Sequence, residues 1–311
     1  MTRSARSRGW RSAGKIALLI AGVLGILGGV YACASPPGIS SARVAWDATP
    51  LGYSAEIGGE TPQIIRINGY AAGPNDGRAV ILVHGTPGSA KVWKDFIQYA
   101  EDQPRAKNLR FITIDRPGFG ESEPKGAMVS LKDQAAALAP LLVAENGQKP
   151  IMKPIILGHS LGGPVAARAG LDYPDAVGGL VLAAGAFDPD LEKVYAIQYL
   201  GDSFLLSWAL PRALKNANRE LIALKAELKE LALGLPQLTT PTIMVHGTDD
   251  DLVPYDNVAF LRRMIDPALP FKLMRIDEGD HFLPWNAKET LLEAILDLDQ
   301  QLRASDPLPA L

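Results

Sequence analysis

The sequence predicts an α/β fold built on a mostly parallel, doubly wound sheet. Three observations support it: β-branched apolar runs alternate with helical stretches, most runs are apolar throughout, and polar motifs follow several of them. The predicted strands are Ile64–Ile67, Ala79–Val83, Arg110–Ile114, Pro154–Leu157, Leu180–Ala183, Thr242–Val245 and Phe271–Ile276. Apolar runs of this kind are typical of parallel strands buried on both faces. The alternation implies right-handed βαβ units, so functional residues are expected at the carboxyl ends of the strands.

Helices are expected in the intervals between these strands, and one interval is different. The predicted helices span about 89–103, 130–146, 161–172, 254–265 and 286–303. Residues 187–236 contain no predicted strand and are interpreted as a small helical insertion, or cap. Residues 35–61 are rich in Pro, Gly, Ser and Thr, which indicates a tether. The expected core therefore has two parts, 62–186 and 237–311, on either side of the insertion.

The charge of the chain is distributed unevenly. Of the 311 residues, 47% are hydrophobic and 21% are charged, which is ordinary for a globular protein. Residues 1–15 carry five positive charges and no acid, and residues 16–32 carry no charge. The net charge of −3 therefore leaves −8 for the remainder of the chain. An acidic body is a poor partner for nucleic acid, because phosphate contacts need a basic surface.

Residues 1–34 are interpreted as an export segment. A basic stretch precedes the apolar run Ile16–Ala32, and small residues follow, which is the order of a secretory signal. Three forms remain open: Val30–Cys33 resembles a lipoprotein lipobox, Ala32–Ala34 fits ordinary signal cleavage, and an uncleaved membrane anchor is the third. We expect an exported protein of the cell envelope, either a lipoprotein held at the membrane through Cys33 or a secreted or periplasmic protein. Cys33 is the single cysteine, so no internal disulfide is expected.

The motif Gly158–Gly163 carries the predicted nucleophile, Ser160. It has the pattern G-x-S-x-G, follows a predicted strand and opens a helix of small residues, which is the context of a nucleophile elbow. Such a serine sits on a sharp, strained turn with its hydroxyl exposed. A Cβ at Gly158 or Gly162 would collide with neighbouring backbone, which explains both glycines.

The loop His84–Ser89 follows another predicted strand and is the expected oxyanion loop. Acyl transfer needs two preorganised N–H donors beside the nucleophile. We expect the amide of Thr86 to supply one and the amide of Leu161 to supply the other. His84 lies at the strand end before the turn, so we expect it to shape this loop rather than act as a base.

The predicted acid lies in a run of three aspartates, Asp249, Asp250 and Asp251. A catalytic histidine needs a carboxylate that orients it and stabilises its cation. The frame G-x-x-D-x-x-V-P selects Asp250, and its two neighbours remain alternatives.

The predicted base is His281, in the loop that follows the last predicted strand. The other three histidines are at positions 84, 159 and 246. Only His281 completes the chain order of nucleophile, acid and histidine that an elbow of this kind requires.

These four motifs, together with the D-R-x-G-x-G-x-S pattern at Asp115–Ser122, resemble the α/β-hydrolase superfamily over residues 62–303. The match is to its esterase- and lipase-like branch with a short cap. The resemblance implies an eight-stranded sheet with strands 3 to 8 parallel. It also implies a cap between strands 6 and 7, where residues 187–236 fall. Haloalkane dehalogenases and epoxide hydrolases of this superfamily carry an aspartate nucleophile, so Ser160 argues against both.

The predicted function is hydrolysis of a carboxylic ester or related acyl bond through an acyl-enzyme on Ser160. The expected partners are a small-molecule ester or acyl substrate and a membrane, through the N-terminal segment. No cofactor or metal is expected, because the sequence lacks the usual metal-ligand and nucleotide-binding motifs. Candidate substrate contacts are His159, Phe204 and Trp208. Alternatives are a lipase, thioesterase, perhydrolase, acyltransferase or carbon–carbon bond hydrolase with the same triad, and a non-catalytic envelope binding lipoprotein.

Overall fold

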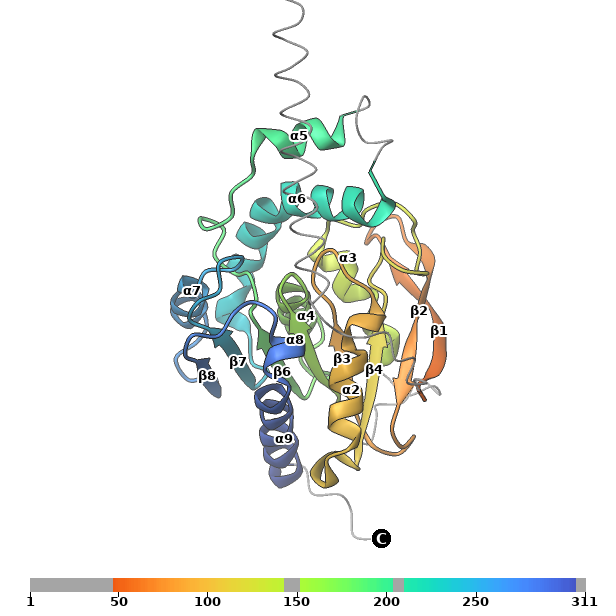
Figure 1. Cartoon of the computed structure of the whole chain (residues 1–311), viewed down its shortest axis with the longest axis vertical. Coiled ribbons are helices and arrows are strands. Elements are labelled where there is room, and N and C mark those ends of the chain that lie inside the picture. The colour runs from red at the N-terminus through yellow and green to blue at the C-terminus, as the bar shows by residue number, and fades with distance from the viewer. Residues whose placement is uncertain (1–46, 143–151, 204–209, 306–311) are drawn as a thin grey trace, which may run out of the picture. The chain divides into compact units, whose positions relative to one another are not determined.

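The structure, a computed structural model, describes residues 47–142, 152–203 and 210–305, all within the unit Ala45–Leu311. Within these ranges an eight-stranded sheet has the order β1-β2-β4-β3-β5-β6-β7-β8 (Figure 1). Its strands are β1 (Thr49–Ile57), β2 (Gln63–Ala72), β3 (Arg78–Val83), β4 (Leu109–Ile114), β5 (Ile155–His159), β6 (Gly179–Ala183), β7 (Thr242–Gly247) and β8 (Phe271–Ile276). The pairs β1–β2 and β2–β4 are antiparallel, and all pairs among β3 to β8 are parallel. The predicted mostly parallel, doubly wound sheet is confirmed.

Strand β1 corrects one prediction, because it lies inside the segment 35–61 that was expected to be a tether. Its residues alternate between the core and solvent, with Tyr53 half-buried and Ala55 and Ile57 buried. This period of two is the signal of an antiparallel strand with one solvated face. The Pro and Gly content of the segment concealed that signal.

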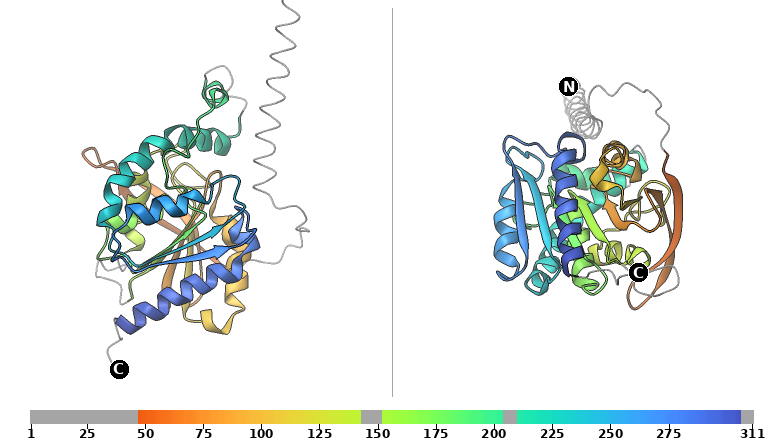
Figure 2. Two further views of the ribbon diagram at one scale, coloured as in Figure 1. Left: turned by 90° about the vertical axis from the view of Figure 1, so that its left-hand side faces the viewer. Right: turned by 90° about the horizontal axis from the view of Figure 1, so that it is seen from below.

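Helices cover both faces of the sheet (Figure 2). One face packs against α2 (Lys94–Glu101), α8 (Leu283–Asn286) and α9 (Lys288–Ser305), and the other against α3 (Leu131–Ala136), α4 (Gly162–Asp172) and α7 (Asp256–Met264). Short 3-10 helices lie at Ala90–Trp93, Pro104–Ala106, Ala139–Leu141 and Leu235–Gln237. Alternate residues of each central strand enter opposite cores: in β3, Ile81 and Val83 face one and Val80 and Leu82 the other. Both cores are therefore built by the same apolar strands.

Two helices, α5 (Ala196–Asp202) and α6 (Arg212–Gly234), follow β6 and precede β7 in the chain. They lie above the sheet in Figure 1. The buried residues of α6 recur at helical spacing: Asn216, Ala217, Glu220, Leu224, Leu228 and Leu231. The Asn216 side chain donates to the carbonyl of Gly118 at 2.7 Å. Helix α6 is thereby attached to the loop that follows β4.

The N-terminal predictions concern residues outside the described ranges, so the export segment 1–34 stays a prediction. In the part of the chain that the structure describes, no helix is long and apolar enough to cross a membrane.

Candidate active site

Ser160 lies on the tight turn between β5 and α4, with φ at 55°. A side-chain-bearing residue in this left-handed region is strained, and such strain concentrates at functional sites. The turn closes because two glycines lack a Cβ. A Cβ on Gly158 would lie 2.0 Å from the carbonyl oxygen of Gly162, and one on Gly162 would lie 2.3 Å from that of Val83. The predicted sharp turn and the predicted need for both glycines are confirmed.

The loop after β3 packs directly against Ser160. A Cβ on Gly85 would lie 2.8 Å from Ser160 Cβ and 3.3 Å from its Oγ, so the backbone at Gly85 touches the serine side chain. The next residue, Thr86, has a hydroxyl that is buried without a protein partner among the described residues. On the other side of Ser160, Leu161 precedes the first turn of α4, where backbone amides have no partner within the helix. Both predicted oxyanion donors thus belong to segments that adjoin Ser160.

His84 shapes the loop after β3, as predicted. Its Nε2 accepts the backbone N–H of Arg116 at 3.0 Å, so its Nδ1 carries the proton and donates to the carbonyl of Gly85 at 2.7 Å. Burial and the nearby Arg116 guanidinium lower the pKa of His84 well below its usual value. The ring is therefore neutral, with both nitrogens bonded inside the protein.

Asp250 and His281, which follow β7 and β8, are in contact. His281 Nδ1 donates to Asp250 Oδ2 at 2.8 Å. The other carboxylate oxygen accepts the backbone N–H groups of Leu252 at 2.9 Å and Val253 at 2.7 Å. A carboxylate can only accept here, so the contact fixes the imidazole tautomer and leaves Nε2 as a proton acceptor.

The three consecutive aspartates have different surroundings. Asp250 is buried, whereas Asp249 and Asp251 are exposed. Sequence reasoning missed His246, whose Nε2 donates to the carbonyl of Val253 at 2.9 Å and lies 3.6 Å from Asp250 Oδ2. Burial lowers the pKa of His246, which keeps it neutral. His246 therefore does not compete with His281 for Asp250 as a charged partner.

His159 connects the elbow to the loop of His281. Its Nε2 donates to the backbone carbonyl of His281 at 2.8 Å, and the two ring centroids are 4.8 Å apart. Burial, followed by the neighbouring His281, lowers the pKa of His159 to about 3, so the ring is neutral near pH 7. This bond gives His159 a positioning role within the protein. The other predicted substrate contacts, Phe204 and Trp208, lie outside the described residues and stay predictions.

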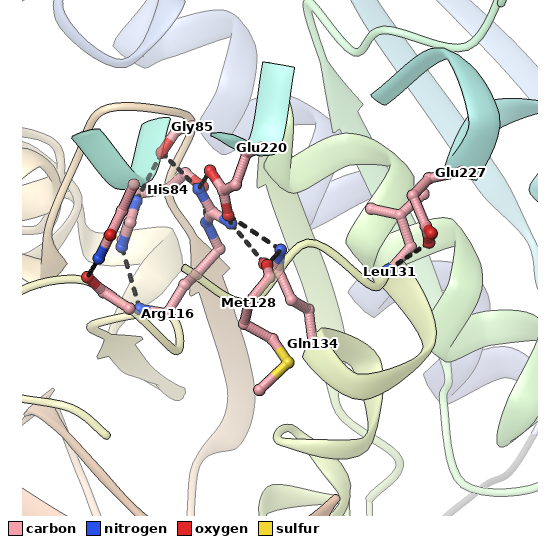
Figure 3. A network of polar contacts seen from close by, with 10 residues as sticks. His84, Gly85, Arg116, Met128, Leu131, Gln134, Glu220 and Glu227 are labelled. Atoms are coloured by element: carbon pink, nitrogen blue, oxygen red, sulfur yellow. Dashed lines mark hydrogen bonds and ion pairs between the residues drawn. The ribbon is translucent and has the colours of Figure 1, made fainter. Parts of the chain in front are cut away.

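A buried ion pair lies against the loop that follows β3 (Figure 3). Arg116, from the loop after β4, donates to both carboxylate oxygens of Glu220 in α6, at 2.7 and 3.1 Å. Both side chains are 1% exposed. Gln134 of α3 bonds to both members of the pair. Within the described ranges, no cluster of three or more His, Cys, Asp or Glu side chains is placed to hold a metal ion.

Glu220 was not predicted as a site residue, although the sequence contains a signal for it. It occupies the same helical face as Leu224, Leu228 and Leu231. An acidic side chain on an apolar helix face is buried only when it is paired with another polar or charged group. The pattern therefore indicates a buried cation opposite α6, and the structure identifies that cation as Arg116.

Known proteins resemble this chain over most of its length. A model of the alpha/beta hydrolase family matches residues 80–294. The chain is 31% identical over 285 residues to a 2-hydroxy-6-oxononadienedioate/2-hydroxy-6-oxononatrienedioate hydrolase of Escherichia coli, covering 80% of this chain and 95% of that protein. It is 27% identical over 215 residues to a pimeloyl-(acyl-carrier protein) methyl ester esterase of Photorhabdus laumondii, covering 57% and 76%. The monoacylglycerol lipase of Paleococcus ferrophilus shares the fold, with a TM-score of 0.57 at 15% identity over 81% of this chain and 99% of that chain.

Proposed function

Because the chain belongs to the alpha/beta hydrolase family, we propose that it hydrolyses carboxylic esters through an acyl-enzyme on Ser160. The observation that carries this proposal is the 2.8 Å bond between Asp250 and His281, on loops that adjoin the elbow of Ser160. An imidazole oriented by a carboxylate, on a loop that adjoins a strained serine, is the arrangement that acyl transfer requires.

The reaction has two halves. In the first, His281 Nε2 takes the proton of Ser160 as Oγ bonds to the ester carbonyl carbon, and the carbonyl oxygen becomes an oxyanion. The C–O bond to the alcohol then breaks, and the leaving alkoxide takes the proton from His281. In the second, water attacks the acyl-enzyme with His281 again as base, which releases the acid and free Ser160.

The oxyanion is assigned to the backbone amides of Thr86 and Leu161. Gly85 packs on Ser160, so the amide that follows it is close to the reacting carbonyl. The amide of Leu161 opens α4, whose N-terminus adds a positive potential where negative charge develops. Donors of this kind stabilise the transition state more than the substrate.

The buried pair of Arg116 and Glu220 offers no free cation to a substrate carboxylate. The guanidinium of Arg116 lies against the oxyanion loop, but Glu220 neutralises it through two bonds. A substrate carboxylate would have to compete with Glu220 for this cation. The 27% identity to a methyl ester esterase supports an ester as substrate.

Hydrolysis of a carbon–carbon bond is the second candidate function. The observation that favours it is the 31% identity to a 2-hydroxy-6-oxononadienedioate hydrolase over 80% of this chain. This reaction also places a carbonyl carbon next to the nucleophile and its oxygen in the same oxyanion site. The two candidates therefore differ in substrate rather than in the residues assigned.

The experiment that tests the proposal is a substrate panel with the purified full-length chain. It contains p-nitrophenyl esters of increasing acyl length, a thioester and 2-hydroxy-6-oxononadienedioate, each also tested with Ser160→Ala. Ester turnover that disappears in the variant is expected. Turnover of the dienedioate alone would replace the ester assignment by the second candidate. Absence of all turnover, together with a Ser160 that no fluorophosphonate labels, would favour a binding protein.

We further propose that residues 1–34 direct the chain to the cell envelope. The support is the order of basic, apolar and small residues in the sequence. Mass spectrometry of the native N-terminus tests this proposal. A lipidated Cys33 or an N-terminus after Ala34 would support export, and an intact residue 1 would contradict both cleaved forms.

A further inference from the structure

We propose that the inserted helix α6 positions the oxyanion peptide, through the buried pair of Glu220 and Arg116. The peptide concerned joins Gly85 to Thr86. This inference rests on the proposed acyl transfer at Ser160. It makes Arg116 and Glu220 positioning residues for that reaction, although they do not touch the substrate.

The orientation of the Gly85–Thr86 peptide is set from its carbonyl side. The carbonyl oxygen of Gly85 accepts two hydrogen bonds, from His84 Nδ1 at 2.7 Å and from Arg116 Nη2 at 3.0 Å. A trans peptide is planar, and its C=O and N–H point in opposite directions. Two donors that hold the Gly85 carbonyl therefore also direct the Thr86 N–H away from Arg116 and His84. The Gly85 side of this peptide packs on Ser160.

Arg116 contacts two successive carbonyls of the loop. Its Nε donates to the carbonyl of His84 at 2.8 Å, while its Nη2 donates to that of Gly85. The guanidinium is planar and rigid, so both carbonyls are fixed relative to one plane. His84 in turn accepts the backbone N–H of Arg116. The loop after β3 and the loop after β4 are thereby joined as one rigid unit beside Ser160.

Helix α6 sets the plane of this guanidinium. Glu220 accepts from both terminal nitrogens of Arg116, and Gln134 Nε2 donates to Glu220 Oε1 at 3.0 Å (Figure 3). A second bond between α6 and α3, from the backbone N–H of Leu131 to Glu227 at 2.8 Å, limits sliding of the two helices. The carboxylate that holds Arg116 is thus itself held by its surroundings.

A buried ion pair contributes little net stability compared with apolar residues of similar volume. An Arg–Glu pair that is 1% exposed therefore suggests a role beyond stability. Here Arg116 supplies donors to carbonyls that apolar side chains would leave with fewer partners. Helix α6 belongs to the insertion between β6 and β7. The oxyanion peptide is therefore oriented by this insertion and not by the sheet alone.

The test replaces the pair by apolar residues, Arg116→Met with Glu220→Leu, in the full-length chain. This double variant removes the donors without leaving an unpaired buried charge. The measurements are kcat and KM for a p-nitrophenyl ester, and the rate at which a fluorophosphonate labels Ser160. In labelling, Oγ bonds to phosphorus, fluoride leaves, the proton passes to His281, and the phosphoryl oxygen takes the oxyanion site. Rates are normalised to the number of sites that finally label, so a loss of folded protein does not imitate the effect.

The matched control is a second buried pair, Arg78 with Asp299, replaced in the same way by Met and Leu. Its nitrogen and oxygen are 2.6 Å apart, and Arg78 begins β3, at the end of the strand opposite His84. Glu220→Gln is the reserve variant in case the double variant does not fold. It keeps the shape and one acceptor of Glu220 but removes the charge that aligns the guanidinium.

We expect the Arg116/Glu220 variant to lower kcat and the labelling rate by about 10- to 100-fold, with KM unchanged, because one oxyanion donor is misoriented rather than removed. The control pair should keep wild-type rates per labelled site. Wild-type rates in the Arg116/Glu220 variant, or an equal loss in the control, would overturn the inference alone. A difference in labelling without any ester turnover would support it and overturn the ester assignment. A wild-type Ser160 that never labels would overturn both.

Discussion

Two buried arginine–carboxylate pairs lie at opposite ends of β3, and their surroundings differ. Arg78 begins the strand and pairs with Asp299 of α9 at 2.6 Å, and it also donates to the carbonyl of Lys153 before β5. Arg116 lies beyond the carboxyl end and pairs with Glu220 of α6 at 2.7 Å. The first pair contacts the backbone at Lys153 and the side chain of Arg303. The second contacts the two carbonyls that precede the proposed oxyanion donor.

The two pairs allow effects on stability and effects on activity to be separated along one strand, β3. In open sheets of parallel strands, ligands bind in the crevice outside the carboxyl ends of the strands, so the loops there carry function. The same charge chemistry should therefore have different consequences at the two ends. Substitutions near Ser160 should reduce activity in a folded protein, whereas substitutions near Arg78 should reduce stability in an active protein.

The largest effect is expected for Ser160→Ala at the carboxyl end. Loss of the nucleophile should lower kcat by about 10⁶-fold, because no acyl-enzyme forms. The free energy of unfolding should not fall, since the φ of 55° is strained for serine already. Ester assays and urea unfolding check both parts, with Ser54→Ala on the exposed side of β1 as control. Residual activity close to wild type would remove Ser160 from the mechanism.

The next largest effect is expected for Asp250→Asn. The amide no longer fixes the tautomer or stabilises the cation of His281, so kcat/KM should fall by about 10⁴-fold. Asp249→Asn and Asp251→Asn are matched controls, because both side chains are exposed neighbours. A larger loss in either control than in Asp250→Asn would move the acid to that position.

A smaller effect is expected for Gly85→Ala. The new Cβ would lie 2.8 Å from Ser160 Cβ, so the loop or the serine must move. A displacement near 1 Å at a reacting group costs about 10²-fold in rate, which we expect in kcat. Gly126→Ala is the control, because a Cβ there meets nothing within 4 Å. Equal rates for the two alanine variants would contradict the placement of Gly85 against the nucleophile.

At the amino end, Arg78→Ala should change stability rather than rate. It removes charged hydrogen bonds to Asp299 and to the carbonyl of Lys153, which we expect to cost about 2 kcal/mol of unfolding free energy. Arg303 remains as a partner of Asp299 at 2.8 Å, which limits the loss. Urea denaturation and kcat per labelled site are the two measurements. A fall in kcat with unchanged stability would contradict the assignment of Arg78 to stability rather than activity.

A pH dependence of stability, with no expected change in rate, should come from His84, His159 and His246. Burial depresses their folded-state pKa values, to about 3 for His159, so the folded protein keeps them neutral. The unfolded chain takes up these protons below pH about 6.5, so stability is complete above that value and falls as the pH decreases. Each histidine should contribute up to about 1.4 kcal/mol per pH unit. Urea unfolding between pH 7.5 and 5 should show a shallower slope for His159→Gln, and an unchanged slope would contradict the neutral assignment.

Much of the fold was predictable because its central strands are buried on both faces and therefore apolar. Each of the seven predicted strands corresponds to one of β2 to β8, and the motifs fall at their carboxyl ends. Strand β1 was missed because an antiparallel edge strand needs only one apolar face. Residues such as Pro50 and Gly52 are tolerated at an edge, where they resemble a tether in sequence.

The candidate site was predictable where chemistry demands a local pattern. A nucleophile elbow needs glycines around Ser160, and a triad needs a fixed chain order, so both leave marks in the sequence. The apolar face of α6 marks Glu220 as buried, but the sequence does not show that its partner is Arg116, because packing of α6 and α3 brings Glu220 and Gln134 to that side chain. The choice among three consecutive aspartates depends on burial, which the structure assigns to Asp250.

The most direct test of the account is to trap the acyl-enzyme during turnover. The full-length chain is mixed with p-nitrophenyl acetate, quenched in acid within the first turnovers, digested and analysed by mass spectrometry. The account predicts an acetyl group on Ser160 in the wild type, one that forms much more slowly in Asp250→Asn, and none in Ser160→Ala. Ester turnover that leaves Ser160 unmodified under all these conditions, or an acetyl group on another residue, would contradict it.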